Sequence, residues 1–155
     1  MLLRAFKPGD LKTLHEIDAA CFPPGVSYSR EELRAFITHR NSRTWVAQEG
    51  EQVIGFLVAQ KAPFRSVHII TIDVAEGSRR RGAGRALLGA AEAWAAIEGA
   101  GSMELETAED NRTAQAFYGR QGYVKARKVE NYYANGAAAW VMVKRLKRGA
   151  DAGQA

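Results

Sequence analysis

Apolar and polar residues along the chain follow two different periods, which separate the expected strands from the expected helices. Residues 66–75 are rich in β-branched side chains and long enough to form a central strand. Residues 43–48 and 52–61 have the pattern of two strands joined by a short polar connection, which is typical of a hairpin. Further strands are expected at 2–6, 102–107, 123–133 and 137–146.

Apolar residues spaced three or four apart predict four helices. After the strand at 66–75 they form one continuous face, made of Leu87, Leu88, Ala91, Trp94 and Ala95. Ser29 and Glu32 have the spacing of a capping box and predict a helix over 30–40. The other two helices are expected at 11–22, with Asp10 as a cap, and at 112–121, with Asp110 or Asn111 as a cap.

The expected elements follow the order β-α-α-β-β-β-α-β-α-β-β. This order describes an α/β domain with a mixed, mostly antiparallel sheet. No repeat, linker or low-complexity segment interrupts it, so we expect a single domain over residues 1–148. Residues 149–155 are mostly small and polar, and we expect them to form a flexible C-terminal tail.

Composition limits the function classes without selecting one. The 155 residues are 46% hydrophobic and 25% charged, as in ordinary globular domains, and no apolar run reaches the ~18 residues of a membrane span. Cys21 is the only cysteine, which excludes an internal disulfide and a multi-cysteine zinc site. We therefore expect no metal and a cytoplasmic location. The net charge of +5 suits either a polyanion or a small anionic ligand.

Three arginines and two glycines stand between the expected central strand and the helix after it, in the segment SRRRGAGRALL at 78–88. A helix N-terminus leaves about four N–H groups unpaired, and glycine lets a ligand approach the backbone. A glycine turn between a strand and a helix is therefore an anion site, to which the arginines add charge. The segment lacks the lysine of a Walker loop, and Leu87 breaks the dinucleotide fingerprint.

The spacing Arg79-x-x-Gly82-x-Gly84 resembles the pyrophosphate loop of the GNAT family of N-acetyltransferases. The segment LETAEDNRTAQAFYGRQGY at 105–123 resembles a second motif of that family. Its form is most like that of RimI-like members, which acetylate the N-terminal alanine of a ribosomal protein. The short segments CFP, HII and NYY strengthen the RimI-like interpretation, and they lie at 21–23, 68–70 and 131–133.

The resemblance implies a GNAT fold, with a mixed sheet of about seven strands flanked by four helices. It also implies acetyl-CoA as the co-substrate. The residues that it places along the acetyl-CoA molecule are Ile72, Asp73, Val74, Arg79, Arg80, Arg81, Gly82, Ala83, Gly84, Arg85, Asn111 and Tyr118.

Acetyl transfer to an amine needs a base for the amine and a proton for the departing thiolate. Alternation along 102–107 puts Glu106 on the face of the other glutamate of that strand, and it is the candidate base; an ordinary exposed glutamate is the alternative. Tyr118 is the candidate acid, because a phenol stays protonated at neutral pH; packing beside Phe117 is the alternative. The backbone N–H of Val74, at an expected bulge, is the candidate oxyanion donor.

Four residues are candidates for the acceptor side of the site. By alternation His68 shares a strand face with Ile70, Ile72 and Val74, and it is either a proton relay to Glu106 or an ordinary sheet histidine. The other three are Tyr28, Tyr132 and Tyr133, and plain strand packing is the alternative for the last two.

We therefore expect transfer of an acetyl group to the α-amine of a protein or peptide N-terminus, with a ribosomal protein as one option. A lysine side chain or a small-molecule amine is the alternative acceptor, because residues 107–110 depart from the RimI pattern. A basic nucleic-acid-binding module is the alternative of a different class. The arginines cluster at one turn without a recognition motif, so we expect no nucleic-acid partner. We also expect no membrane partner, and a monomer or weak dimer.

Overall fold

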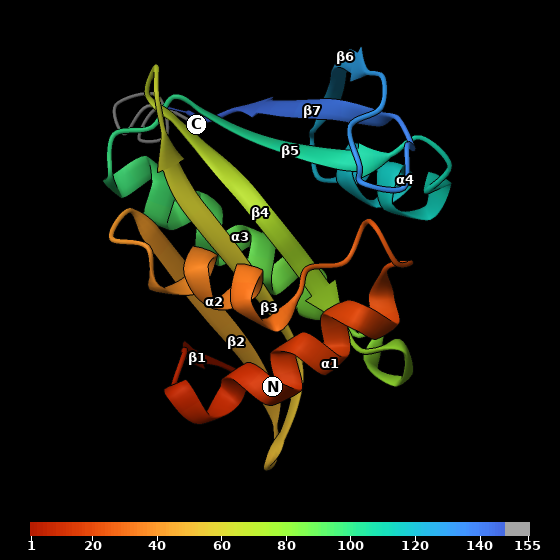
Figure 1. Ribbon diagram of the computed structural model, residues 1–155. Helices are drawn as coiled ribbons and strands as arrows, with labels where there is room; N and C mark the ends of the chain where they lie inside the picture. Colours follow the sequence, from red (N-terminus) through yellow and green to blue (C-terminus); the bar gives the residue numbers. More distant parts are fainter. Residues whose placement is uncertain (148–155) are drawn as a thin grey trace.

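The computed structural model describes residues 1–147, which contain seven strands and four α-helices (Figure 1). The strands are β1 Leu2–Ala5, β2 Ser42–Glu49, β3 Gln52–Ala62, β4 Ser66–Val74, β5 Ser102–Ala108, β6 Val124–Val129 and β7 Ala139–Arg145. The helices are α1 Leu11–Cys21, α2 Arg30–Thr38, α3 Ala83–Ile97 and α4 Arg112–Arg120. The predicted order of elements is confirmed, whereas the predicted tail at 149–155 lies outside the described residues.

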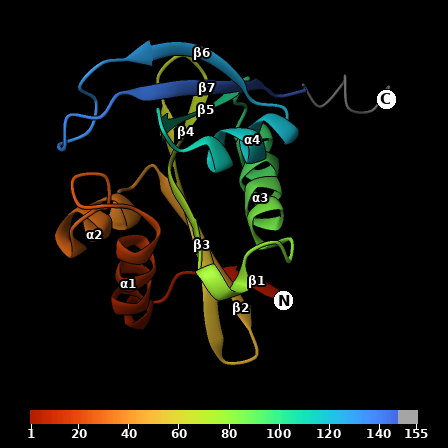
Figure 2. The ribbon, with the colours of Figure 1, turned by 90° about the vertical axis from the view of Figure 1, so that its right-hand side faces the viewer.

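All seven strands belong to one sheet, in the order β1-β2-β3-β4-β5-β7-β6. Neighbouring strands are antiparallel except β4 and β5, which run parallel. Helices α1 and α2 cover one face of the β2–β4 half and α3 covers the other, while α4 lies beside β5 and β7 (Figure 2). The predicted mixed, mostly antiparallel α/β fold is confirmed. No helix in residues 1–147 is long and apolar enough to cross a membrane.

The sheet opens between its two parallel strands. β4 and β5 pair only along their first residues, where 66–68 face 102–104. Beyond that point the two strands diverge, as Figure 1 shows. Backbone N–H and C=O groups on the facing edges of the diverging segments therefore have no strand partner, and they are available to a ligand.

A bulge interrupts β4 at Ile70. The pairing with β3 shifts between Val58 and Ala59, which pair with Thr71 and Ile69, so Ile70 has no residue opposite it. A bulge adds one residue to a strand and thereby reverses the alternation of the side chains that follow. The expected bulge at Val74 is therefore displaced by four residues toward the middle of the strand.

The bulge divides the side chains of β4 between the two faces of the sheet. Ile69 and, beyond the bulge, Ile72 and Val74 pack against the core under α3, whereas Ile70 packs against the cluster under α1 and α2. The prediction that His68 shares a face with Ile72 and Val74 is wrong for this reason. Simple alternation assumes an unbroken strand, and β4 is not one.

Local capping explains where several helices begin. Ser29 and Glu32 form the predicted capping box, with bonds of 3.1 and 2.9 Å. Asn111 caps α4 through its Oδ1, which accepts the N–H of Ala114 at 3.1 Å. Asp10 does not cap α1 with its side chain, because its carboxylate pairs with Arg4 at 2.8 Å.

The connection between β6 and β7 is a loop of residues 130–138, longer than the three residues 134–136 left between the two expected strands. β6 ends at Val129, and Asn131 adopts a left-handed backbone with φ 51°. Tyr132 and Tyr133 are therefore on a loop and not in a strand, which frees their side chains from the alternation of the sheet.

Candidate functional site

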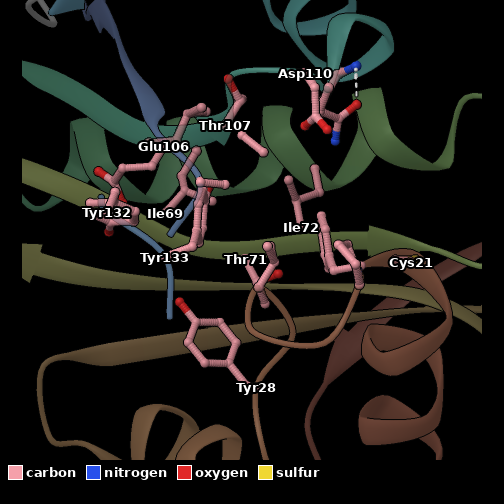
Figure 3. A pocket seen from close by; sticks show the side chains of 18 of the residues that line it. Cys21, Tyr28, Ile69, Thr71, Ile72, Glu106, Thr107, Asp110, Tyr132 and Tyr133 are labelled. Carbon is pink, nitrogen blue, oxygen red and sulfur yellow. Dashed lines mark hydrogen bonds between the residues drawn. The ribbon is translucent and has the colours of Figure 1, made fainter. Parts of the chain in front are cut away.

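A pocket of about 380 Å³ occupies the opening between β4 and β5. Its walls come from residues 69–72 of β4, 105–108 of β5, α4, the segment 21–28 and the loop 132–137. Figure 3 shows Glu106, Tyr132 and Tyr133 grouped at one end of the pocket, with Cys21 and Ile72 at the other. Segments from both halves of the chain thus meet at one cavity.

Glu106 lies on β5, and its side chain is only 12% exposed. Its Oε1 is 2.6 Å from Nε2 of His68 and accepts a second hydrogen bond, of 2.8 Å, from the hydroxyl of Tyr132. The predicted base is therefore at the pocket and is held by two donors. A freely solvated glutamate, the alternative for this residue, does not describe this environment.

His68 lies on β4 next to Glu106 and is half-buried. Burial lowers the pKa of His68, but the hydrogen bond to Glu106 and the negative charge of that carboxylate raise it, and the net shift is upward. The two residues form an ion pair when the imidazole is protonated. His68 thus contacts the candidate base, although it is not itself part of the pocket wall.

Tyr118 lies on α4, is 8% exposed and lines the pocket. Burial, followed by the charge of Asp73 and the neighbouring Tyr133, raises the pKa of Tyr118 well above its usual range. The phenol therefore carries its proton at neutral pH and can donate it. Tyr118 also packs edge to face against Phe117, and it is the more buried of the two rings.

The three tyrosines that were predicted for the acceptor side all lie at the pocket. Tyr28 donates its hydroxyl to the carbonyl of Ile70 at 3.4 Å, across the bulge. Tyr132 and Tyr133 pack edge to face, with ring centroids 4.9 Å apart. All three line the pocket, and the structure brings them together from two loops that are far apart in the sequence.

The loop before α3 has the backbone of an anion site. Gly82 is left-handed with φ 87° and is the N-cap of α3. The first backbone bond of the helix runs from the N–H of Ala86 to the carbonyl of Gly82 at 3.0 Å. The N–H groups of residues 83–85 precede that bond and have no helix carbonyl to pair with, which is the arrangement that binds phosphate.

Gly84 serves packing as well as ligand approach. A Cβ at this position would lie 3.2 Å from the ring of Phe117, which is tighter than ordinary contact. A glycine here lets the first turn of α3 approach α4 closely. Glycine is therefore favoured at the two positions for different reasons: the backbone is left-handed at Gly82, and α3 contacts α4 closely at Gly84.

The arginines of the loop point in different directions. Arg79 turns back onto the end of β4, where Nε donates to the carbonyl of Val74 at 3.0 Å and Nη2 lies 3.5 Å from Sγ of Cys21. Arg81 lies 4.0 Å from Glu49 in an exposed pair. Arg80, whose φ is 65°, and Arg85 are exposed beside the helix start. The loop itself lies outside the walls of the pocket.

The end of β4 is divided between the pocket and the core. Ile72 lines the pocket, whereas the carboxyl group of Asp73 is buried on the opposite face with Thr71 and Asp18. Burial, together with the neighbouring Asp18, raises the pKa of Asp73 well above its usual range. Of Asp73, only the backbone can contact a ligand in the pocket.

Sequence reasoning missed this buried pair of acids, and it missed Cys21 as part of the pocket wall. Asp18 is fully buried and accepts the backbone N–H of Tyr28 at 2.8 Å, which ties the segment 21–28 to α1. The one available signal was an aspartate beside Ile17, on the apolar side of an amphipathic helix.

The sequence is similar to that of known acetyltransferases. Residues 11–123 match the profile of the acetyltransferase (GNAT) family. An uncharacterized N-acetyltransferase of Methanocaldococcus jannaschii is 28% identical over 146 residues, which cover 94% of this chain and 92% of that protein. N-alpha-acetyltransferase 30 of Homo sapiens is 32% identical over 117 residues, which cover 72% of this chain and 32% of that protein.

Solved structures show the same fold at lower identity. Ard1 from Thermoplasma volcanium has a TM-score of 0.85 at 24% identity, over 95% of this chain and 98% of that one. The ribosomal-protein-S18-alanine N-acetyltransferase from Escherichia coli has a TM-score of 0.83 at 20% identity, over 96% and 95% of the two chains. The family match spans most of the described sheet, the loop before α3 and the candidate base and acid. The chain therefore belongs to the GNAT family and is an acetyl-CoA-dependent N-acetyltransferase.

Proposed function

We propose that this enzyme transfers the acetyl group of acetyl-CoA directly to the α-amine of a protein or peptide N-terminus. The observation that carries the proposal is the position of Glu106, which two donors hold at the end of the pocket walled by three tyrosines. Among the described residues that line this pocket there are two carboxylates, Glu106 and Asp110, and neither lysine nor arginine. Such a wall attracts an ammonium group and repels an acidic first residue.

Acetyl-CoA, the donor of the acetyl group, fits the opposite side of the opening. The free N–H groups at the start of α3 would receive the pyrophosphate. The edge of β4 at residues 72–74 has no strand partner, although the carbonyl of Val74 already accepts Nε of Arg79, and its remaining backbone groups would pair with the amides of the pantetheine arm. Asn111 uses Oδ1 for its cap, so its NH₂ group is available to a carbonyl of the same arm.

The reaction then needs three proton transfers. Glu106 accepts a proton from the ammonium group, and the neutral amine attacks the carbonyl carbon of the thioester. As the C–N bond forms and the C–S bond breaks, the sulfur leaves as a thiolate and takes the proton of Tyr118. The nitrogen of the new amide then gives up its second proton to the tyrosinate, directly or through water, which restores Tyr118. A backbone N–H at the bulge in β4, where the ladder is interrupted, would stabilise the negative charge on the carbonyl oxygen.

The acceptor is proposed to be a protein N-terminus of the kind used by RimI-like enzymes, including a ribosomal protein. The support comes from relatives whose names specify N-terminal acetylation, namely N-alpha-acetyltransferase 30 and the ribosomal-protein alanine acetyltransferase. The fold alone does not select this acceptor, since a spermidine N-acetyltransferase shares it with a TM-score of 0.75.

The test is acetyl-CoA consumption with a panel of acceptors at equal concentration. The panel contains peptides with Ala, Ser, Met or Asp as the first residue, the same peptides with a blocked N-terminus and an internal lysine, and free polyamines. We expect turnover with the free N-termini, weakest for the Asp peptide. Turnover that survives N-terminal blocking, or that occurs only with polyamines, would assign the enzyme to a lysine or small-molecule acceptor.

A further inference from the structure

The carboxylate of Glu106 is held at one of its two oxygens. Nε2 of His68 lies 2.6 Å from Oε1, and the hydroxyl of Tyr132 donates to the same oxygen at 2.8 Å. A carboxylate oxygen has two lone-pair directions, so these two bonds fill Oε1. Oε2 is left as the oxygen that can accept a proton from an incoming ammonium group.

We propose that Tyr132 is a positioning residue for Glu106: its hydroxyl, together with His68, fixes the carboxylate so that Oε2 receives the proton of the acceptor. The inference rests on the proposed function only in taking Glu106 as the base. It gives Tyr132 a task that lining the acceptor pocket does not require.

The surroundings of Tyr132 support this assignment. The residue is 43% exposed, and a phenol on such a loop could keep its hydroxyl in water. Instead the ring packs edge-on against Tyr133 and the hydroxyl is directed to a carboxylate on β5. The bond therefore joins the loop 130–138 to the base, across 26 residues of sequence.

Tyr133 provides a matched control from the same loop. It lines the same pocket, and no hydrogen bond between its hydroxyl and Glu106 is found in residues 1–147. The charge of Glu106 nevertheless acts on it, because burial and then that charge raise the pKa of Tyr133 to about 12. Tyr132 and Tyr133 are thus the same type of residue, lie on the same loop and are both affected by the charge of Glu106. They differ in that only Tyr132 has a hydrogen bond to Glu106.

The electrostatic setting of Glu106 determines the sign of the expected effect. The titratable groups that interact with it from the packed elements are His68 of β4 and the three tyrosines Tyr28, Tyr132 and Tyr133. A donor to a carboxylate favours its charged form, so loss of the Tyr132 hydroxyl favours the protonated form. The acidic limb of the pH–rate profile then moves to higher pH.

The experiment compares Tyr132→Phe and Tyr133→Phe with the parent enzyme. For Tyr132→Phe we expect kcat to fall about tenfold and the acidic limb of kcat/KM to rise by about one pH unit, with the Kd of acetyl-CoA unchanged. For Tyr133→Phe the limb stays in place, whatever happens to the KM of the acceptor. Replacing Tyr132 with 3-fluorotyrosine, a stronger donor, should move the limb to lower pH.

A measurement that does not depend on turnover separates the role of Tyr132 from the role of Glu106 as the base. The ¹³C carboxyl signal of Glu106, identified by its loss in Glu106→Gln, should titrate at higher pH in Tyr132→Phe and unchanged in Tyr133→Phe. If Tyr132→Phe changes only the KM of the acceptor, and neither the Glu106 carboxyl signal nor the acidic limb of the pH–rate profile shifts, then Tyr132 lines the pocket without positioning Glu106. A shifted signal combined with full activity of Glu106→Gln would instead refute Glu106 as the base and leave the contact standing.

Discussion

At the scale of single residues, the chemistry depends on whether Glu106 accepts the proton of the amine. Glu106→Gln keeps the size of the side chain and an oxygen for His68 and Tyr132, but it removes the basic group. We expect kcat/KM for a peptide to fall by about 10²–10⁴-fold. The deficit should be largest below pH ~8, where an α-amine arrives protonated, and should shrink above it.

Glu104→Gln is the control for this prediction. Glu104 lies on the same strand, faces Arg127 at 3.9 Å and is not part of the pocket wall. Its pH profile should match that of the parent enzyme. A Glu106→Gln profile parallel to the parent's at every pH would reject Glu106 as the base.

The ion pair between His68 and Glu106 predicts a pH dependence of stability. The pKa of His68 is raised above its usual 6.5 in the folded protein, so protonated His68 favours folding. This contribution is complete below pH 6.5 and is lost as the pH rises through the folded-state pKa. The free energy of unfolding lost in His68→Gln should therefore be larger at pH 6 than at pH 9, measured by urea denaturation. A loss that grows toward pH 9 would contradict the sign.

Sequence reasoning found the candidate base and acid and offered His68 as one possible partner of Glu106, but it missed the bond from Tyr132. Glu106 and Tyr118 are identified by residue type and spacing within one segment, and the structure places both at one pocket. The bond from Tyr132 to Glu106 depends on where β6 ends and the loop 130–138 begins. The contact between His68 and Glu106 depends on β4 lying next to β5. Such contacts are tertiary, so no local pattern encodes them.

At the scale of elements, periodicity predicted every helix and strand, and its errors share one cause. The bulge at Ile70 and the early end of β6 at Val129 are both interruptions of regular strands. A strand interior looks the same in sequence whether or not one residue is left without a partner. The segment before α3 was predictable because glycine and the strand–helix change mark it locally.

The start of α3 yields a stability prediction. Gly82 has φ 87° and no atom within 4 Å of a built Cβ, so Gly82→Ala meets only the cost of a left-handed backbone, about 1 kcal/mol. Gly89 lies inside α3, also with free space around it, and Gly89→Ala should stabilise the protein by up to about 1 kcal/mol. Urea denaturation measures both, and equal effects of the same sign would exclude a backbone requirement at Gly82.

At the scale of the whole molecule, the divergence of β4 and β5 divides the sheet into two parts. Only residues 66–68 and 102–104 pair across the division, and the pocket occupies the space beyond them. The walls come from the first part through 21–28 and 69–72, and from the second through 105–108, α4 and 132–137. A ligand in this opening contacts both parts and replaces the strand pairing that is missing there.

This geometry predicts how acetyl-CoA should stabilise the protein. At 100 times its Kd the ligand adds about 2.7 kcal/mol to the free energy of unfolding. Because the binding mode proposed for acetyl-CoA spans the opening, we expect slower hydrogen exchange in β4 beyond the bulge and in α4, as well as in the loop 79–85. Exchange measured by mass spectrometry, beside a thermal melt, tests both statements. Protection confined to the loop would mean that only the phosphates are held. An RNA that raises the Tm where acetyl-CoA does not would overturn the assignment of the loop.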